Sequence, residues 1–208
     1  MPMDPVAVQI FHITPIANLA AIAAKGGLLS DAALEAVPHE VVGYSHIKSR
    51  RLMEYRIPCC GQRFVGEFVP FYFCPRSPML FVINKGRTGL QPGSQGSIVH
   101  LVSTVAIGVA TGRQFAISDG NAGAAYTRFA GSLDALDELD WAVIKSDDWG
   151  GERRNRKSAE FLIADQFPWS SVREIGCMDA GAQLRVQAIL AEVGGVGPAV
   201  NVRRNWYF

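Results

Sequence analysis

Two side chains stand in surroundings that do not normally hold them. Glu160 lies between Ala159 and the apolar run 161–164, where a carboxylate loses solvation free energy unless it has a partner. His12 is near the end of an apolar stretch, and the ends of strands often line clefts, where an imidazole suits a hydrogen-bond donor to a bound nucleotide. Each residue also fits a hydrogen-bonded structural role, so the local sequence leaves both interpretations open.

Basic residues gather in two segments, residues 48–63 and 153–157, and acidic residues gather between them at 134–148. The formal net charge is only +1, yet a nearly neutral protein with segregated charge can present a basic face to phosphates. Solvated helix faces explain the pattern equally well. Nothing local distinguishes Arg51 from Arg50 in the first segment.

Residues 68–80 hold four aromatic residues and three prolines around Arg76. A rigid turn between core strands has this composition. So does a stiff aromatic surface beside a cation, which would stack a nucleobase and hold a phosphate.

Several familiar chemistries lack their signatures. The chain has no phosphate-binding loop, dinucleotide fingerprint, zinc-protease helix or nucleophile elbow. Its cysteines form no C-x-x-C pair, which favours free thiols in a reducing compartment and predicts no metal site. The N-terminus does not resemble a secretory signal, and no apolar run approaches the ~20 residues of a membrane span. We therefore expect a soluble, cytoplasmic protein that does not interact with membranes.

The elements that position these residues follow from periodicity and capping signals. With 208 residues, 49% of them hydrophobic, the chain is expected to form one domain over residues 1–208. A strand over residues 6–13 leads into a helix that Thr14 caps and that runs to about Lys25, where Gly26 and Gly27 stop it. A second helix over 44–55 carries the first basic segment.

Further strands are predicted over 67–84, 115–117 and 200–203 and around Ile175, and residues 98–102 suit another strand or the start of a helix. Within the first of these ranges, the apolar run 79–83 suits a strand buried on both faces, although its periodicity does not exclude a short helix. Helices are predicted over 132–145 and 181–193. Together these elements indicate an α+β protein built on a mainly antiparallel sheet.

The chain resembles the DarT family of DNA ADP-ribosyltransferase toxins over nearly its whole length, from Phe11 to Tyr207. The most specific segment is Phe68-Val-Pro-Phe-Tyr-Phe-Cys-Pro-Arg-Ser-Pro-Met-Leu80. Tyr44-Ser-His-Ile-Lys-Ser-Arg-Arg51, Ser118-Asp-Gly-Asn121 and Lys157-Ser-Ala-Glu-Phe-Leu162 follow in the family's order around it. Four short matches in one order are far more specific than a single match.

The resemblance implies a split ADP-ribosyltransferase sheet that clasps NAD⁺ as co-substrate, and transfer of ADP-ribose to thymine in a short single-stranded DNA motif. It makes Glu160 and Arg51 the catalytic residues. The residues expected at NAD⁺ are His12, Thr14, Asn18, Gly27, Leu28, Tyr72 and Arg51. Those expected at DNA are His46, Lys48, Arg50, Arg76, Met79, Arg153 and Arg154. A cognate macrodomain-type antitoxin is the implied protein partner, and residues 28–45 are the candidate loop that closes over NAD⁺.

Physical chemistry divides the work between the two catalytic residues. Cleavage of the nicotinamide–ribose bond develops an oxocarbenium-like ribose, which a carboxylate at Glu160 would stabilise. A thymine ring nitrogen must lose a proton to become nucleophilic, and a cation at Arg51 would favour the anionic base. An unpaired base is required because pairing occupies that edge. The alternatives are modification of guanine in DNA, an NAD⁺-using RNA phosphotransferase, and a non-enzymatic nucleic-acid-binding module in which Glu160 is structural.

Overall fold

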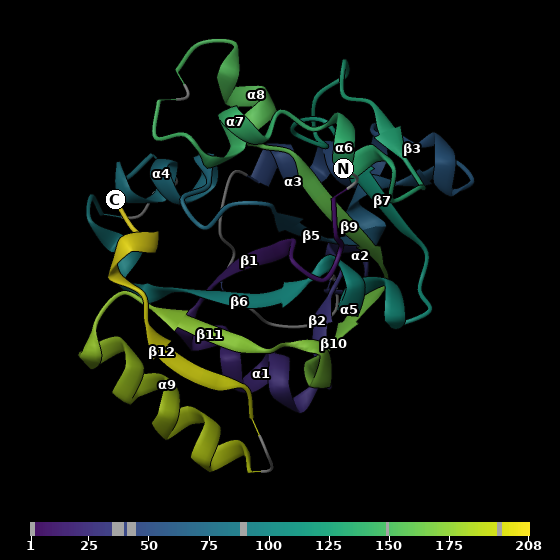
Figure 1. Ribbon diagram of the computed structural model, residues 1–208. Coiled ribbons are helices and arrows are strands. Elements are labelled where there is room, and N and C mark those ends of the chain that lie inside the picture. Colours follow the sequence, from purple (N-terminus) through teal and green to yellow (C-terminus); the bar gives the residue numbers. More distant parts are fainter. Residues whose placement is uncertain (1–2, 35–39, 41–44, 88–90, 149, 195–196) are drawn as a thin grey trace.

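A computed structural model describes residues 3–34, 40, 45–87, 91–148, 150–194 and 197–208. These residues form an eight-stranded sheet with the order β12-β11-β6-β1-β5-β9-β7-β8 (Figure 1). Its strands are β1 (Gln9–Pro15), β5 (Phe68–Tyr72), β6 (Ile98–Thr104), β7 (Phe115–Ser118), β8 (Phe129–Ala130), β9 (Glu160–Ala164), β11 (Glu174–Cys177) and β12 (Ala199–Val202). All neighbours pair antiparallel except β11 and β12. The α+β class with a mainly antiparallel sheet is confirmed.

Helices and two small two-stranded sheets surround the large sheet. The pairs are β2 (Gly27–Leu29) with β10 (Gln166–Pro168), and β3 (Arg56–Ile57) with β4 (Arg63–Phe64). The helices are α1 (Leu19–Ala24), α2 (Asp31–Leu34), α3 (Ser45–Met53), α4 (Pro78–Asn84), α5 (Val105–Ala110), α6 (Ala135–Glu138), α7 (Trp141–Lys145), α8 (Arg153–Lys157) and α9 (Ala180–Val193). In Figure 1, α9 and α1 lie together beside β12 and β11, while α7 and α8 lie at the opposite end of the molecule. The helices predicted over 44–55 and 181–193 are confirmed as α3 and α9.

The centre of the sheet is formed by β6, β1, β5 and β9. All five residues of β9 are buried, as are the first six of β6, which explains why these strands are almost continuously apolar in sequence. In the register of β5, Tyr72 pairs with Phe11 of β1 on one side and with Glu160 of β9 on the other. The polar side chains near this point are therefore embedded in the apolar core.

The first strand begins and ends later than predicted, and the first helix also begins later. Thr14 and Pro15 remain in β1, paired with Val99 and Ile98 of β6, and a 3₁₀ turn over Ile16–Asn18 precedes α1. The cap predicted at Thr14 was wrong because pairing with β6 overrides the local capping preference. The glycine stop is confirmed, with φ of +74° at Gly26 and +146° at Gly27.

The buried strand predicted over 79–83 was wrong, because these residues belong to α4. The Ser77 side chain caps this helix by accepting a hydrogen bond from the Leu80 amide at 3.2 Å. Pro78 occupies the first turn, where its missing N–H costs nothing. Ser77-Pro78 was the signal in the sequence that a helix begins here, but the continuous apolar run after it is equally typical of a buried strand.

The helix predicted over 132–145 is divided into α6 and α7. The break falls at Leu139 and Asp140, and the Asp140 carboxylate caps α7 by accepting from the Val143 amide at 3.1 Å. Leu136, Leu139 and Val143 are buried, so these apolar residues face the core although the helix is not continuous. No helix in the described part of the chain is long and apolar enough to cross a membrane.

Candidate active site

Three adjacent strands contribute polar side chains to a common cavity. His12 comes from β1, Tyr72 from β5 and Glu160 from β9, which are neighbours in the sheet. All three line a cavity of about 190 Å³ beside α1, α2 and α3, and so does Arg51 of α3. The cavity thus joins residues separated by up to about 150 positions in the sequence.

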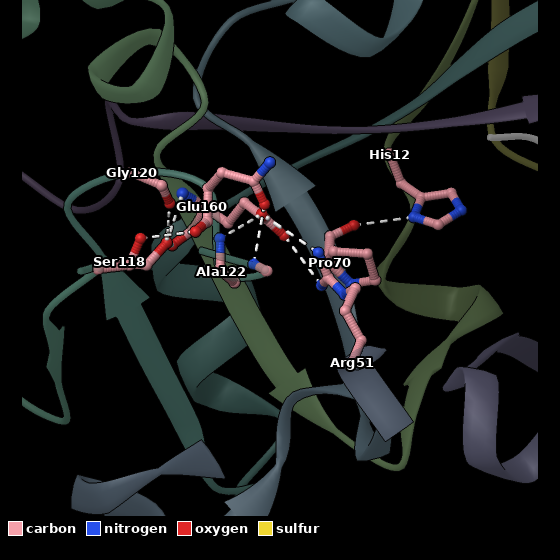
Figure 2. Close-up of polar contacts among 10 residues, drawn as sticks. His12, Arg51, Pro70, Ser118, Gly120, Ala122 and Glu160 are labelled. Atoms are coloured by element: carbon pink, nitrogen blue, oxygen red, sulfur yellow. Dashed lines mark hydrogen bonds and ion pairs between the residues drawn. The ribbon is translucent and has the colours of Figure 1, made fainter. Parts of the chain in front are cut away.

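Arg51 is the partner that the isolated carboxylate of Glu160 requires. Its Nη2 donates to Oε2 at 3.0 Å and its Nη1 to Oε1 at 3.3 Å, a two-pronged ion pair (Figure 2). The side chains are 11% and 2% exposed, respectively. Neighbouring Arg50 instead pairs with Glu54 at 2.8 Å on the surface. The structure therefore separates the two arginines that the sequence did not distinguish.

Burial and the ion pair together determine the charge states of Arg51 and Tyr72. Burial by itself would lower the pKa of the Arg51 guanidinium, but the charge and hydrogen bonds of Glu160 outweigh it and raise that pKa. Burial, together with the negative charge of Glu160, raises the pKa of the Tyr72 phenol well above its usual range. Arg51 is thus a cation and Tyr72 a neutral hydroxyl at physiological pH.

Backbone groups of the loop after β7 hold Glu160 from its other side. Oε1 accepts a hydrogen bond from the Ala122 amide at 2.9 Å. The Glu160 amide donates to Ser118 Oγ at 3.0 Å, and that hydroxyl donates to the Gly120 carbonyl at 2.7 Å (Figure 2). Sequence reasoning assigned no role to Ser118 or Ala122. The segment 118–121, which Ala122 directly follows, was the only feature of the sequence that pointed to this part of the site.

His12 faces the cavity as a hydrogen-bond acceptor. Its Nδ1 lies 2.8 Å from the Pro70 carbonyl oxygen (Figure 2). A carbonyl only accepts, so Nδ1 carries the proton. Burial lowers the pKa of the imidazole, against a smaller opposing effect of the Pro70 bond, so the ring is neutral and Nε2 has a free lone pair. This tautomer favours an acceptor at Nε2 over the donor that the sequence suggested, and a contact of His12 with a nucleotide stays a prediction.

The remaining residues predicted at NAD⁺ all line the same cavity: Thr14, Asn18, Gly27 and Leu28. Gly27 is required by close packing, since a Cβ there would lie 2.1 Å from the Phe167 carbonyl oxygen. The Asn18 amide is already engaged, donating to the Glu40 carbonyl at 2.9 Å and accepting from the Glu40 amide at 2.8 Å. Asn18 thus anchors the chain at residue 40. Residues 35–39 and 41–44 of the candidate closing loop lie outside the described residues.

The residues predicted at DNA are only partly brought together. Lys48 and Met79 line the cavity, where Lys48 Nζ pairs with Asp31 at 3.0 Å. Arg50, Arg76, Arg153 and Arg154 do not line it. His46 belongs to α3, but its side chain lies outside the described part of the structure.

The charge segregation seen in the sequence does not survive folding. Members of the second basic segment pair with the acidic segment, Arg153 with Asp148 at 2.7 Å and Arg156 with Asp140 at 2.9 Å. Arg76 pairs with Asp147 at 2.7 Å and lies over the Phe208 ring. Lys157 is buried, with Nζ donating to the Ile144 and Ser146 carbonyls. The predicted basic track is thus largely neutralised, although Arg154 is exposed.

Other cavity-lining residues were missed. Lys25, Asp31, Glu40 and Pro70 also line the cavity; Asp31 and Glu40 lie in the candidate closing loop 28–45 and Pro70 in the segment 68–80, but no role was predicted for any of the four individually. Among the residues that the structure describes, no group of three or more His, Cys, Asp or Glu side chains is arranged to hold a metal ion. The charged side chains at the cavity include the buried pair Arg51–Glu160.

Comparison with known proteins gives consistent results. Residues 11–208 match the family model described as "ssDNA thymidine ADP-ribosyltransferase, DarT". A protein of Thermus aquaticus named DNA ADP-ribosyl transferase is 41% identical over 206 residues, covering 98% of this chain and 90% of its own length.

Solved structures resemble the whole chain. The structure of Thermus sp. 2.9 DarT in complex with ADP-ribosylated single-stranded DNA superposes with a TM-score of 0.92 at 34% identity, covering 100% of this chain and 99% of that one. The same Thermus sp. 2.9 protein in complex with NAD⁺ gives a TM-score of 0.89 at 32% identity, and each chain is covered completely.

Proposed function

Since the chain belongs to the DarT family of single-stranded-DNA thymidine ADP-ribosyltransferases, which use NAD⁺, we propose that it transfers ADP-ribose to a thymine base within a short preferred sequence and releases nicotinamide. The observation that carries this proposal is the buried Arg51–Glu160 pair at a cavity shared with His12 and Tyr72. These side chains fit the chemistry of NAD⁺, because they offer one anion, one neutral acceptor and one neutral hydroxyl to a ribose and its leaving group.

Glu160 and His12 serve the ribose. As the bond between C1′ and the nicotinamide nitrogen breaks, positive charge develops on the ribose, and the Glu160 carboxylate stabilises that charge. The Ala122 amide and Arg51 fix the carboxylate in place beforehand, so little reorganisation is needed. Nε2 of His12 accepts a hydrogen bond from a ribose hydroxyl. Nicotinamide leaves as a neutral molecule, so no general acid is required.

Arg51 serves the acceptor base. The thymine ring nitrogen loses its proton to solvent water and forms the new bond to C1′, and an adjacent guanidinium lowers the free energy of the anionic base. A guanidinium has five N–H donors, so the ion pair with Glu160 does not exhaust it. Lysine would supply the charge without the planar fork. Arg51→Lys should therefore be poorly tolerated.

The strand of DNA reaches this cavity from its open side. Lys48 and Met79 line the cavity, and we assign them to the target nucleotide. Arg50, Arg76, Arg153 and Arg154 remain candidates for the flanking phosphates. Thr14, Gly27 and Leu28 are assigned to NAD⁺. Because DNA modified in this way would block replication, we further propose that the protein is a toxin whose mark is reversed by a cognate macrodomain-type antitoxin.

The test is incubation with NAD⁺ and two single-stranded oligonucleotide pools, one complete and one lacking thymine, followed by mass spectrometry of the digested nucleosides. ADP-ribosylated thymidine in the first pool and no product in the second supports the proposal. Modified guanosine in both pools would transfer the assignment to guanine. No product on DNA with folded protein, or an equal product yield with Glu160→Gln, would refute the proposed function.

A further inference from the structure

The loop that holds the Glu160 carboxylate is itself held by a side chain outside the cavity. The loop, residues 118–123, follows β7 and supplies the Ala122 amide that Oε1 accepts from at 2.9 Å. Asn155, in α8, accepts a hydrogen bond from the Asn121 amide at 3.1 Å through Oδ1. We propose that Asn155 is a positioning residue for the reaction, which sets the orientation of the Glu160 carboxylate through this loop. The inference rests on the proposed role of Glu160.

The contact between Asn155 and the loop is close as well as polar. A Cβ built on Gly120 would lie 2.1 Å from Asn155 Nδ2 and 2.9 Å from Oδ1. No side chain fits at residue 120 while the amide of Asn155 occupies its place. Position 120 therefore requires glycine, because Asn155 packs directly against its backbone. This close packing brings the Asn121 amide within hydrogen-bond distance of Asn155 Oδ1.

Hydrogen bonds within the loop connect its residues, so a change in the contact between Asn155 and Asn121 displaces the loop as a unit. Asn121 Oδ1 accepts from the Gly123 amide at 2.8 Å, and the Asn121 carbonyl accepts from Thr127 Oγ1 at 2.6 Å. At the other end Ser118 Oγ donates to the Gly120 carbonyl at 2.7 Å. A shift at Asn121 is thus carried to Ala122, whose amide contacts the carboxylate.

The helix α8, which carries Asn155, is also held in place. Arg156 pairs with Asp140 at 2.9 Å, and Lys157 Nζ donates to the carbonyls of Ile144 and Ser146, both at 2.8 Å. These contacts attach α8 to α7 immediately on the C-terminal side of Asn155. Misplacement of a reacting group by about 1 Å can cost ~10² in rate, so this path has direct consequences for catalysis.

Asn155→Ala tests the inference, with Asp179→Ala as the matched control. Asp179 makes a hydrogen bond of the same kind, accepting from the Ala182 amide at 2.8 Å at the start of α9, remote from the loop. We expect Asn155→Ala to lower kcat about ten- to a hundredfold with the KM for NAD⁺ nearly unchanged, and to speed amide hydrogen exchange at residues 121 and 122. Asp179→Ala should do neither. Equal kcat in the two variants, or unchanged exchange in the loop, would overturn the inference.

A second variant keeps the test independent of any general loss of stability. Gly120→Ala should displace the Asn155 amide and lower kcat in the otherwise native chain, whereas in the Asn155→Ala background the new methyl group meets vacant space and its effect should largely disappear. Additive effects of the two substitutions would contradict the proposed contact. Glu160→Gln separates the two hypotheses. If it retains activity, the proposed function fails, and if it is inactive while Asn155→Ala is normal, only the positioning role fails.

Discussion

Removing one member of the buried ion pair should affect stability and activity in different ways. Glu160 and Arg51 are 2% and 11% exposed, so a substitution of Glu160 by methionine leaves a nearly buried guanidinium unpaired. Such a loss typically costs about 3–5 kcal/mol. It also removes the acceptor of the Ala122 amide, and an unsatisfied buried donor costs about 1–3 kcal/mol. A combined cost of several kcal/mol corresponds to a fall in Tm of roughly ten degrees or more, at about 2–4 °C for each kcal/mol in a domain of this size.

The double substitution Arg51→Met with Glu160→Met should recover most of this stability. Both charges are then absent, and apolar side chains of similar length fill the space, so only the cost at the Ala122 amide remains. The two substitutions should therefore be strongly non-additive, with a coupling free energy of about 3 kcal/mol or more, at the upper end of values for contacting residues. The double variant should nevertheless be inactive.

Urea denaturation followed by tryptophan fluorescence measures the four free energies of unfolding, and mass spectrometry of a modified oligonucleotide measures transfer. Arg50→Met with Glu54→Met is the matched control, because that pair is 2.8 Å apart but about half exposed, and exposed pairs contribute only about 0–1 kcal/mol. Additive effects at Arg51 and Glu160, or a double variant that still transfers ADP-ribose, would refute the reasoning.

Three further outcomes are expected. His12→Phe should weaken NAD⁺ binding about fivefold, the scale of one lost hydrogen bond of about 1 kcal/mol, while DNA binding is retained; calorimetric titrations giving unchanged NAD⁺ affinity would contradict the acceptor role. Asn18→Ala should release the chain at Glu40, to which it makes two hydrogen bonds, and expose the cavity wall to limited proteolysis before residue 45; an unchanged cleavage pattern would argue against that anchor. Burial lowers the pKa of His100 to about 4, so the stabilisation of the fold by the neutral imidazole is complete above pH 6.5 and is lost as the pH falls toward 4. The free energy of unfolding should therefore fall by about 2 kcal/mol between pH 7 and 5. The same pH dependence in His100→Gln as in the wild-type protein would exclude this residue as the cause.

The sheet was predictable from sequence wherever the apolar pattern was decisive on its own. The strand β7 was found because it holds aromatic and β-branched residues, whereas residues 98–102 suited a strand or the start of a helix and belong to β6. Prediction failed where a capping signal competed with pairing. Thr14 precedes Pro15 and Ser77 precedes Pro78, so both positions carry the same helix-start signal. Thr14 nevertheless joins β1 because it pairs with β6, whereas Ser77 caps a helix. The two dipeptides alone do not show which outcome follows.

The site was predictable only in part, for a related reason. Glu160 was identified because a lone carboxylate in an apolar strand requires compensation. Its partner lies 109 residues away in the sequence, and the choice between Arg51 and Arg50 depends on the rotation of α3 relative to β9. The tautomer of His12 depends on the Pro70 carbonyl, 58 residues away. The charge segregation misled because pairs such as Arg76–Asp147 form across 71 residues.

The strand order has a consequence for the growing chain on the ribosome. Each pairing that builds the site is distant in sequence, since β1 pairs with β6 and β5 pairs with β9. Such topologies fold slowly, because long loops must close before the contacts form. At about 5–20 residues synthesised per second, Arg51 emerges several seconds before Glu160 and remains hydrated until β9 arrives. An unfinished chain thus holds the Arg51 cation without the Glu160 anion. Because the proposed catalytic pair needs both residues, we expect transfer only after Glu160 has been made and β9 has joined the sheet.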